Sequence, residues 1–127
     1  MTILCLIQYN VRMMNKKHEN AFEKLKQEMR RGVIVLAAMS QLNQEQYGYS
    51  LIKSLKKKGF EVGQDTLYPL LRRLEQQELL DSEWRVDDSR PRRYYTLNET
   101  GKEMLRDLKA EWSEQEEIIR RLLDETE

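Results

Sequence analysis

The chain has 127 residues, enough for one domain with a modest core and too few for a second comfortable domain. Its formal net charge of zero excludes a uniformly basic nucleic-acid binder, although residues 1–97 carry 17 Lys and Arg against 12 Asp and Glu, and residues 98–127 carry 5 against 10. A single cysteine, Cys5, and a single histidine, His18, exclude an intrachain disulfide, the usual metal clusters and a catalytic triad, so neither an enzyme nor a metal or cofactor site is expected.

The first 18 residues are interpreted as an N-terminal extension. Residues 1–9 are apolar but far shorter than the ~20 residues that cross a bilayer, and they lack a basic leader and a cleavage site, so a cytoplasmic protein is expected. Met13 or Met14 is an alternative start of the protein. Alternatively, residues 1–14 add an apolar strip to a dimer contact, and the sequence leaves both options open.

A helix is predicted from about Glu19, because Phe22, Leu25 and Met29 recur at helical spacing. Gly32 interrupts this pattern. The nearly all-apolar residues 33–39 then predict a short, largely buried helix, either bent away from the first or continuous with it.

Residues 47–58 predict the next helix, with Leu51, Ile52 and Leu55 facing inward and Gly59 ending it. Its lysines, at positions 53 and 56–58, face outward. They either bind DNA phosphates or form an ordinary solvated surface, and the two readings are about equally supported.

The stretch that begins at Gln64 predicts an amphipathic helix whose inner side carries Leu67, Leu70, Leu71 and Leu74. Asp65 or Thr66 is expected to cap its start, with Pro69 near the first turn. The outer side offers polar and cationic side chains at positions 66, 68, 72, 73 and 76.

A β-hairpin is predicted to follow, with strands at residues 80–86 and 92–97 and a polar turn at residues 87–91. Alternation sends Arg92 and Arg93 to opposite faces. Trp84 is predicted to pack in the core or against the hairpin, and Arg90 and Arg92 are the preferred ligand contacts.

A short exposed helix followed by an arginine-bearing hairpin suits duplex DNA, since the helix can reach base edges in the major groove and the hairpin can reach phosphates or the minor groove. We therefore predict a mainly α fold with a small β-hairpin, a winged helix-turn-helix over residues 19–97. The predicted DNA-binding residues are Gln64, Thr66, Tyr68, Pro69, Arg72, Arg73, Lys53, Arg90 and Arg92.

The last segment, residues 98–127, predicts one long helix capped by Asn98 or Thr100 and ending near Leu123. Spacings of three and four define a heptad stripe that is too long for one small domain to cover, so it is expected to form a homodimer. Two-fold symmetry then implies inverted-repeat DNA sites. The predicted dimerisation residues are Leu105, Leu108, Trp112, Gln115, Ile119 and Leu122.

Several short motifs resemble the PadR family of bacterial transcriptional regulators and occur in its order and spacing. They are RRG (30–32), YGYSLI (47–52), DTLYPLLRRLE (65–75), LLDSEW (79–84) and RPRRYYTLNETG (90–101). Two positions depart from the family pattern, because Asp65 and Glu78 stand where glycine is usual. At the second position, Glu78, we predict a residue other than glycine in the left-handed conformation at the end of the helix that carries Leu67 to Leu74. The resemblance implies a sequence-specific DNA-binding repressor that acts as a homodimer.

The string EWSEQEEII (111–119) resembles the final helix of the small PadR-type repressors of multidrug efflux pumps, in which a tryptophan from each subunit stacks on flat aromatic drugs at the dimer interface. This resemblance implies that Trp112 stacks on an effector, with Leu108 and Val33 as walls and Glu116 attracting cationic ligands. Lys109 stands where that subgroup has a second aromatic residue. The alternatives are that Trp112 only fills the dimer contact of a repressor without small-molecule input, or that the winged helix binds a partner protein.

Overall fold

The computed structural model describes residues 2–125, with the side chains of residues 9–14 left aside. The chain divides into two units, residues 1–33 and 34–127, with the division inside α2 (Lys16–Ser40). Each unit is described by itself.

The first unit contains helix α1 (Ile3–Met14) and most of α2. The backbone N–H of His18 donates to Oδ1 of Asn15 at 3.0 Å, so Asn15 caps the start of α2. The helix thus begins three residues before the predicted Glu19, and it continues without interruption through Gly32. Of the two readings left open by the sequence, a continuous helix is the one observed.

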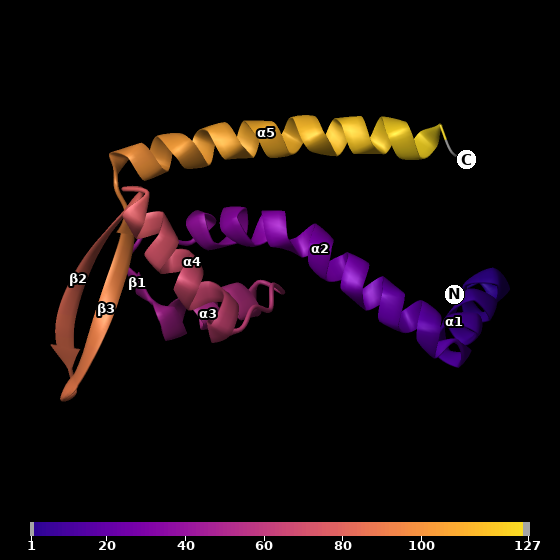
Figure 1. Cartoon of the computed structure of the whole chain (residues 1–127), viewed down its shortest axis with the longest axis horizontal. Helices are drawn as coiled ribbons and strands as arrows, with labels where there is room; N and C mark the ends of the chain where they lie inside the picture. Colours follow the sequence, from indigo (N-terminus) through magenta and orange to yellow (C-terminus); the bar gives the residue numbers. More distant parts are fainter. Residues whose placement is uncertain (1, 126–127) are drawn as a thin grey trace. The chain divides into compact units, whose positions relative to one another are not determined.

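The second unit holds the remaining elements, which Figure 1 shows in chain order: β1 (Gln46–Tyr47), α3 (Gly48–Lys57), α4 (Gln64–Gln76), β2 (Leu80–Asp87), β3 (Arg90–Leu97) and α5 (Glu99–Asp124). The strands form one antiparallel sheet in the order β1-β3-β2. The predicted fold class is confirmed, a mainly helical winged helix-turn-helix with a long final helix. The two-residue strand β1 was not predicted.

The core of this unit is made almost entirely of leucine side chains from α3, α4 and the bases of the two long strands. Leu51, Leu67 and Leu71 are at most 2% exposed, and Ala38 and Met39 at the end of α2 pack with them. The predicted inward faces of α3 and α4 are therefore confirmed. Burying these side chains is the main source of folding free energy, at roughly 25 cal/mol for each Å² of apolar surface.

The start of α4 differs from the prediction. Gly63 is the N-cap residue, and no side chain caps the helix, since Asp65 and Thr66 already lie within the first turn. Asp65 still stabilises the helix start through the helix dipole. Pro69 is inside the helix, beyond the first turn, so it removes one backbone donor from the helix interior.

The hairpin turn is also shorter than predicted, because Asp87 pairs with Arg90 and only Asp88 and Ser89 connect the strands. Both connecting residues have positive φ, 48° and 67°, as in the tight turns that match the twist of paired strands. The strands consequently extend to the tip of the hairpin. The predicted alternation is confirmed, since Ser82 pairs with Tyr95 and Trp84 with Arg93.

Trp84 lies outside the core, so that part of its prediction is wrong, whereas the predicted packing on the hairpin is observed in its contact with Arg93. Its side chain is 64% exposed, and Val86 on the same face is 73% exposed. Eight-residue strands carry both side chains away from the leucine core at the base of the sheet.

Two residues, Glu78 and Asn98, connect the segment after α4 with the start of α5. Glu78, just after α4, has a φ of 62°, which confirms the predicted left-handed position occupied by a non-glycine residue. Asn98 caps α5, because its Oδ1 accepts from the Gly101 N–H at 2.8 Å, and its Nδ2 donates to the Glu78 carbonyl at 2.9 Å. One asparagine side chain therefore bonds both to the first turn of α5 and to the segment that follows α4.

Candidate nucleic-acid interface

The outer side of α4 presents most of the side chains predicted to reach DNA bases. Leu67, Leu70, Leu71 and Leu74 occupy the buried side of this helix, so the rest of its circumference faces solvent. Of the predicted contacts on α4, Gln64, Thr66, Pro69, Arg72 and Arg73 are exposed, and the acidic Asp65 is exposed beside them. A helix that exposes hydroxyl, amide and guanidinium groups in this way can bond to base edges and phosphates.

Tyr68 is placed differently from the other predicted contacts. Its ring is half-buried and packs against the core, directly over Gly48 at the start of α3. A Cβ at position 48 would clash with this ring. Glycine at this position therefore allows α3 and α4 to approach closely, and Tyr68 helps to fix the angle between them.

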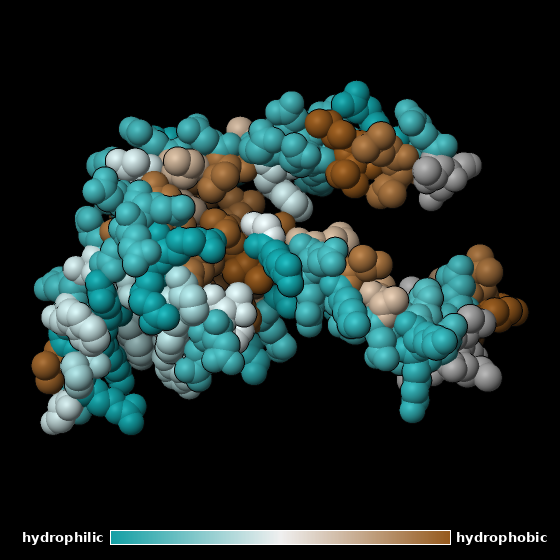
Figure 2. All heavy atoms as spheres, in the orientation of Figure 1, coloured by the Kyte–Doolittle hydropathy of each residue, from teal (hydrophilic) through white to brown (hydrophobic). Residues whose placement is uncertain are grey.

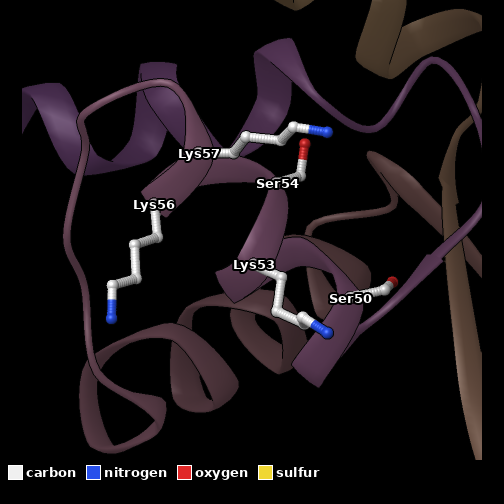
Figure 3. A pocket seen from close by; sticks show the side chains of 5 residues that line it. All are labelled: Ser50, Lys53, Ser54, Lys56 and Lys57. Carbon is white, nitrogen blue, oxygen red and sulfur yellow. The ribbon is translucent and has the colours of Figure 1, made fainter.

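The exposed face of α3 carries a basic depression lined by Ser50, Lys53, Ser54, Lys56 and Lys57, shown in Figure 3. The Lys53 ammonium lies 5.2 Å from the centre of the Tyr49 ring, a cation–π distance that leaves the charge in water. Lys58 is held apart from this group, because its Nζ donates to Oε1 of Gln41 at 2.7 Å. The predicted outward orientation of the lysines is confirmed, and their binding to phosphate stays a prediction.

The three arginines near the hairpin tip have different surroundings. Arg90 is exposed, and the Arg92 guanidinium lies 4.5 Å from the centre of the Tyr47 ring. Arg93 makes an ion pair with Glu75 of α4, at 2.5 Å between Nη2 and Oε1, and its Nε donates to the Ser82 hydroxyl at 3.1 Å. Arg93 is therefore a structural residue, whereas Arg90 and Arg92 carry charges that no salt bridge in residues 2–125 neutralises.

The contact between Glu75 and Arg93 fixes the hairpin against α4. The Ser82 hydroxyl also donates to Glu75, so one carboxylate holds both strands. These hydrogen bonds and the Arg93 charge lower the pKa of Glu75, and the carboxylate in turn raises the pKa of Arg93. The pair stays charged over the whole physiological pH range.

A groove of about 350 Å³ lies between α4 and the hairpin. It is lined by three residues of α4, by Tyr47 and Gly48 at the start of α3, and by five residues of the hairpin: Tyr68, Leu71 and Arg72, then Tyr47 and Gly48, then Trp84, Pro91, Arg92, Arg93 and Tyr95. Trp84 was not predicted from the sequence as a residue of this surface. Its charged neighbours Glu83 and Arg85, and its distance along the strand from the core leucines, were the available signals.

The residues predicted for dimerisation follow one side of α5. Leu105 and Leu108 pack in part against the core, but Trp112, Ile119 and Leu122 are 44%, 51% and 52% exposed. Figure 2 shows hydrophobic residues gathered at the end of α5 away from the hairpin. The Gln115 side chain donates to Glu111, its neighbour one turn earlier, at 2.9 Å.

Of the four residues predicted to bind an effector, Val33 belongs to the first unit and the other three to the second, so their joint arrangement stays a prediction. Trp112 is exposed, Leu108 is partly covered, and Val33 is half-buried on α2 in the first unit. Glu116 already makes an ion pair with Arg120 at 2.9 Å. The negative charge of Glu116 is thus partly neutralised by an arginine one turn later in the same helix.

Within residues 2–125, no group of three or more histidine, cysteine or carboxylate side chains is arranged to hold a metal ion. The helices of this part of the chain are also too short or too polar to span a membrane.

Comparison with known proteins gives consistent matches. Residues 35–107 match the model of the transcriptional regulator PadR-like family. A crystal structure of a PadR family transcriptional regulator from Eggerthella lenta is 39% identical, covers 86% of this chain and 97% of its own, and superimposes with a TM-score of 0.82. A PadR-like transcription factor from Bacteroides fragilis is 35% identical over 78% of this chain and 98% of its own, with a TM-score of 0.66. A transcriptional regulator of Mycobacterium tuberculosis is 44% identical over 61 residues, which are 48% of this chain and 57% of that protein.

Proposed function

We propose a specific role for this chain, which belongs to the PadR-like family of transcriptional regulators: a homodimeric, cytoplasmic repressor that binds inverted-repeat operators. The observation that carries this proposal is the surface of α4, where a leucine side is fully buried and a polar and cationic side is exposed next to the hairpin. In this proposal α4 enters the major groove with Gln64, Thr66, Pro69 and Arg72. Arg73 and Lys53 lie on the backbone, and Arg90 and Arg92 on phosphates or the flanking groove.

The exposed stripe of α5 supports the homodimer. Trp112, Ile119 and Leu122 are about half exposed along one side of a 26-residue helix, and such a side is stable in water when a second helix covers it. A two-fold dimer places its two recognition helices on successive major-groove turns, roughly 34 Å apart. Inverted-repeat operators follow from that symmetry.

Release by a planar aromatic effector is the finer part of the proposal. It is supported by the exposed indole of Trp112 on the stripe that the second subunit would cover, with Leu108 one turn earlier. An effector between the subunits would change the separation of the two α4 helices. Linkage then requires that DNA weaken effector binding by the same factor as the effector weakens DNA binding.

The test is binding to the promoter DNA upstream of the chain's own gene, with and without a panel of planar aromatic compounds, at two salt concentrations. Tight, sequence-selective binding that a compound releases is the expected result. Selective binding that no compound changes would favour a repressor without small-molecule input. Weak binding that is equal on unrelated DNA and absent at the higher salt would instead favour a winged helix that binds a partner protein.

Arg92→Ala sharpens this test. If Arg92 neutralises one phosphate, the substitution should lower DNA affinity and flatten the plot of log affinity against log salt by about one unit. Arg106→Ala, an exposed arginine on α5, is the matched control and should leave the slope unchanged. Equal slopes for wild type and Arg92→Ala would remove Arg92 from the interface.

A further inference from the structure

The exposed indole of Trp84 is the feature that the proposed function leaves unexplained. Tryptophan is the largest apolar side chain, and 64% of this one faces solvent in the second unit. The Arg93 guanidinium lies 5.7 Å from the centre of the Trp84 ring and the same distance from the centre of the Tyr95 ring. Glu75 fixes that guanidinium through the ion pair, and the guanidinium in turn packs against the indole, which lines the groove between α4 and the hairpin.

The groove combines apolar ring surfaces with arginines that no salt bridge neutralises among the described residues. Trp84, Pro91 and Tyr68 supply ring surfaces, and the charge of Arg93 is neutralised by Glu75. Arg72 and Arg92 also line the groove, and neither takes part in a salt bridge within residues 2–125. The matching ligand has an apolar body with anionic groups on both sides.

We propose that this groove binds one deoxyribose of a DNA strand, with the sugar against the Trp84 ring and its two flanking phosphates near Arg72 and Arg92, so that Arg72 contacts the backbone at the border of the major groove instead of a base edge. The proposal rests on the DNA-binding function above and deepens it. A volume of about 350 Å³ accommodates a single sugar–phosphate unit, and the groove adjoins the exposed side of α4, where the strand bordering the major groove would pass. Because every nucleotide has the same sugar and phosphate, this contact adds affinity without sequence preference.

Single-tryptophan proteins test the contact directly, since Trp84 and Trp112 are the only two tryptophans in the chain. In a Trp112→Phe protein, acrylamide quenching of the remaining Trp84 should fall several-fold when duplex DNA is bound. The same protection should appear with the promoter fragment and, at low salt, with an unrelated duplex. Unchanged quenching of Trp84 at saturating DNA would overturn the proposal.

The reciprocal variant reports on the rest of the molecule. In a Trp84→Phe protein, DNA should change the quenching of Trp112 much less than it changes that of Trp84. An equal change at both positions would indicate a general rearrangement instead of a local contact, and it would also overturn the proposal.

Affinity measurements give an independent readout. Trp84→Ala should weaken binding to the promoter and to unrelated DNA by the same factor, on the order of ten-fold, because one well-packed aromatic contact is lost. The salt slope should not change, since no charge is removed. Val86→Ala is the matched control, because Val86 is 73% exposed on the same face of the hairpin but does not line the groove.

These outcomes separate this proposal from the one above. If wild type prefers the promoter and Trp84 stays open to acrylamide, only the groove assignment fails. If wild type binds all DNA equally and Trp84 is protected, the sequence-specific repressor fails and the groove assignment stands. Absence of DNA binding even at low salt would refute both proposals.

Discussion

Helices α4 and α5 are both amphipathic, but their apolar sides end in different environments. The four leucines of α4 are at most 4% exposed, whereas Trp112, Ile119 and Leu122 of α5 are 44–52% exposed. The apolar side of α4 is therefore fully covered within the second unit. The distal half of α5 is left uncovered within that unit, and in the proposed dimer a second α5 covers it. In that proposal the same sequence pattern serves folding in one helix and assembly in the other.

The largest difference between the two helices is expected from one alanine substitution on each apolar side. Leu71→Ala should cost about 3 kcal/mol of unfolding free energy, because Leu71 is 2% exposed and its removal leaves a cavity in the core. Leu122→Ala should instead weaken dimer association and leave the folding of the monomer almost unchanged. Urea unfolding and sedimentation equilibrium measure the two quantities. A large loss of monomer stability in Leu122→Ala would mean that the end of α5 packs within its own chain.

Substitutions at the buried start of α5 should lower the free energy of unfolding, as substitutions in α4 do, unlike those in the distal half of α5. Gly101 is buried, and a Cβ there would collide with the backbone carbonyl of Leu79, which cannot move as a flexible side chain can. Gly101→Ala should therefore destabilise the domain by about 2 kcal/mol, the usual cost of overpacking a core. Ala110→Ser, on an exposed part of the same helix, is the control in the same thermal unfolding experiment. Equal stability of Gly101→Ala and wild type would show that the first turn of α5 can shift freely.

The ion pair between α4 and the hairpin should make stability depend on acid. The folded-state pKa of Glu75 is lowered, so its contribution is fully present above the unfolded pKa of about 4.3 and is lost as pH falls through the lower folded value. Glu75→Gln should therefore cost about 1 kcal/mol at pH 7, a figure discounted for partial solvent exposure, and less below about pH 4. Urea unfolding at several pH values checks this. A pH-independent difference between the two proteins would rule out the ionised pair as the cause.

The smallest effect is expected at the end of α4. Glu78 holds a φ of 62°, a conformation that costs a residue with a Cβ roughly 1 kcal/mol and costs glycine much less. Glu78→Gly should accordingly raise the unfolding free energy by about 0.5–1 kcal/mol. Glu99→Gly, in the first turn of α5, lacks such strain and should be destabilising. A loss of stability in Glu78→Gly would show that the Glu78 side chain makes a contribution larger than the backbone strain.

The accuracy of the sequence predictions followed the length of the pattern behind each one. The leucine periodicity of α4 and the long stripe of α5 repeat over several turns, so both helices were predicted correctly. By contrast, β1 has two residues, and its pairing with Tyr94 and Tyr95 depends on a segment almost 50 positions away in the chain. No local pattern identifies such a strand.

The errors at the candidate interface have a similar cause. Asp65 and Thr66 are good capping residues, but the observed cap is Gly63, because leucine burial determines where the helix begins. Trp84 was expected to pack in the core or against the hairpin, and only the length of the hairpin shows that the core ends before it. The exposed side of α4 and the different surroundings of Arg92 and Arg93 followed from helical and strand alternation.

Asn98 has a mechanical consequence for a regulator of this kind. Its side chain bonds to the first turn of α5 and to the carbonyl of Glu78 just after α4, and its backbone N–H donates to the Leu79 carbonyl at 3.2 Å. These three bonds link the start of α5 to the segment that leaves α4. In the proposed dimer, a rotation of α5 imposed by the second subunit is therefore expected to be passed on to α4 through Asn98.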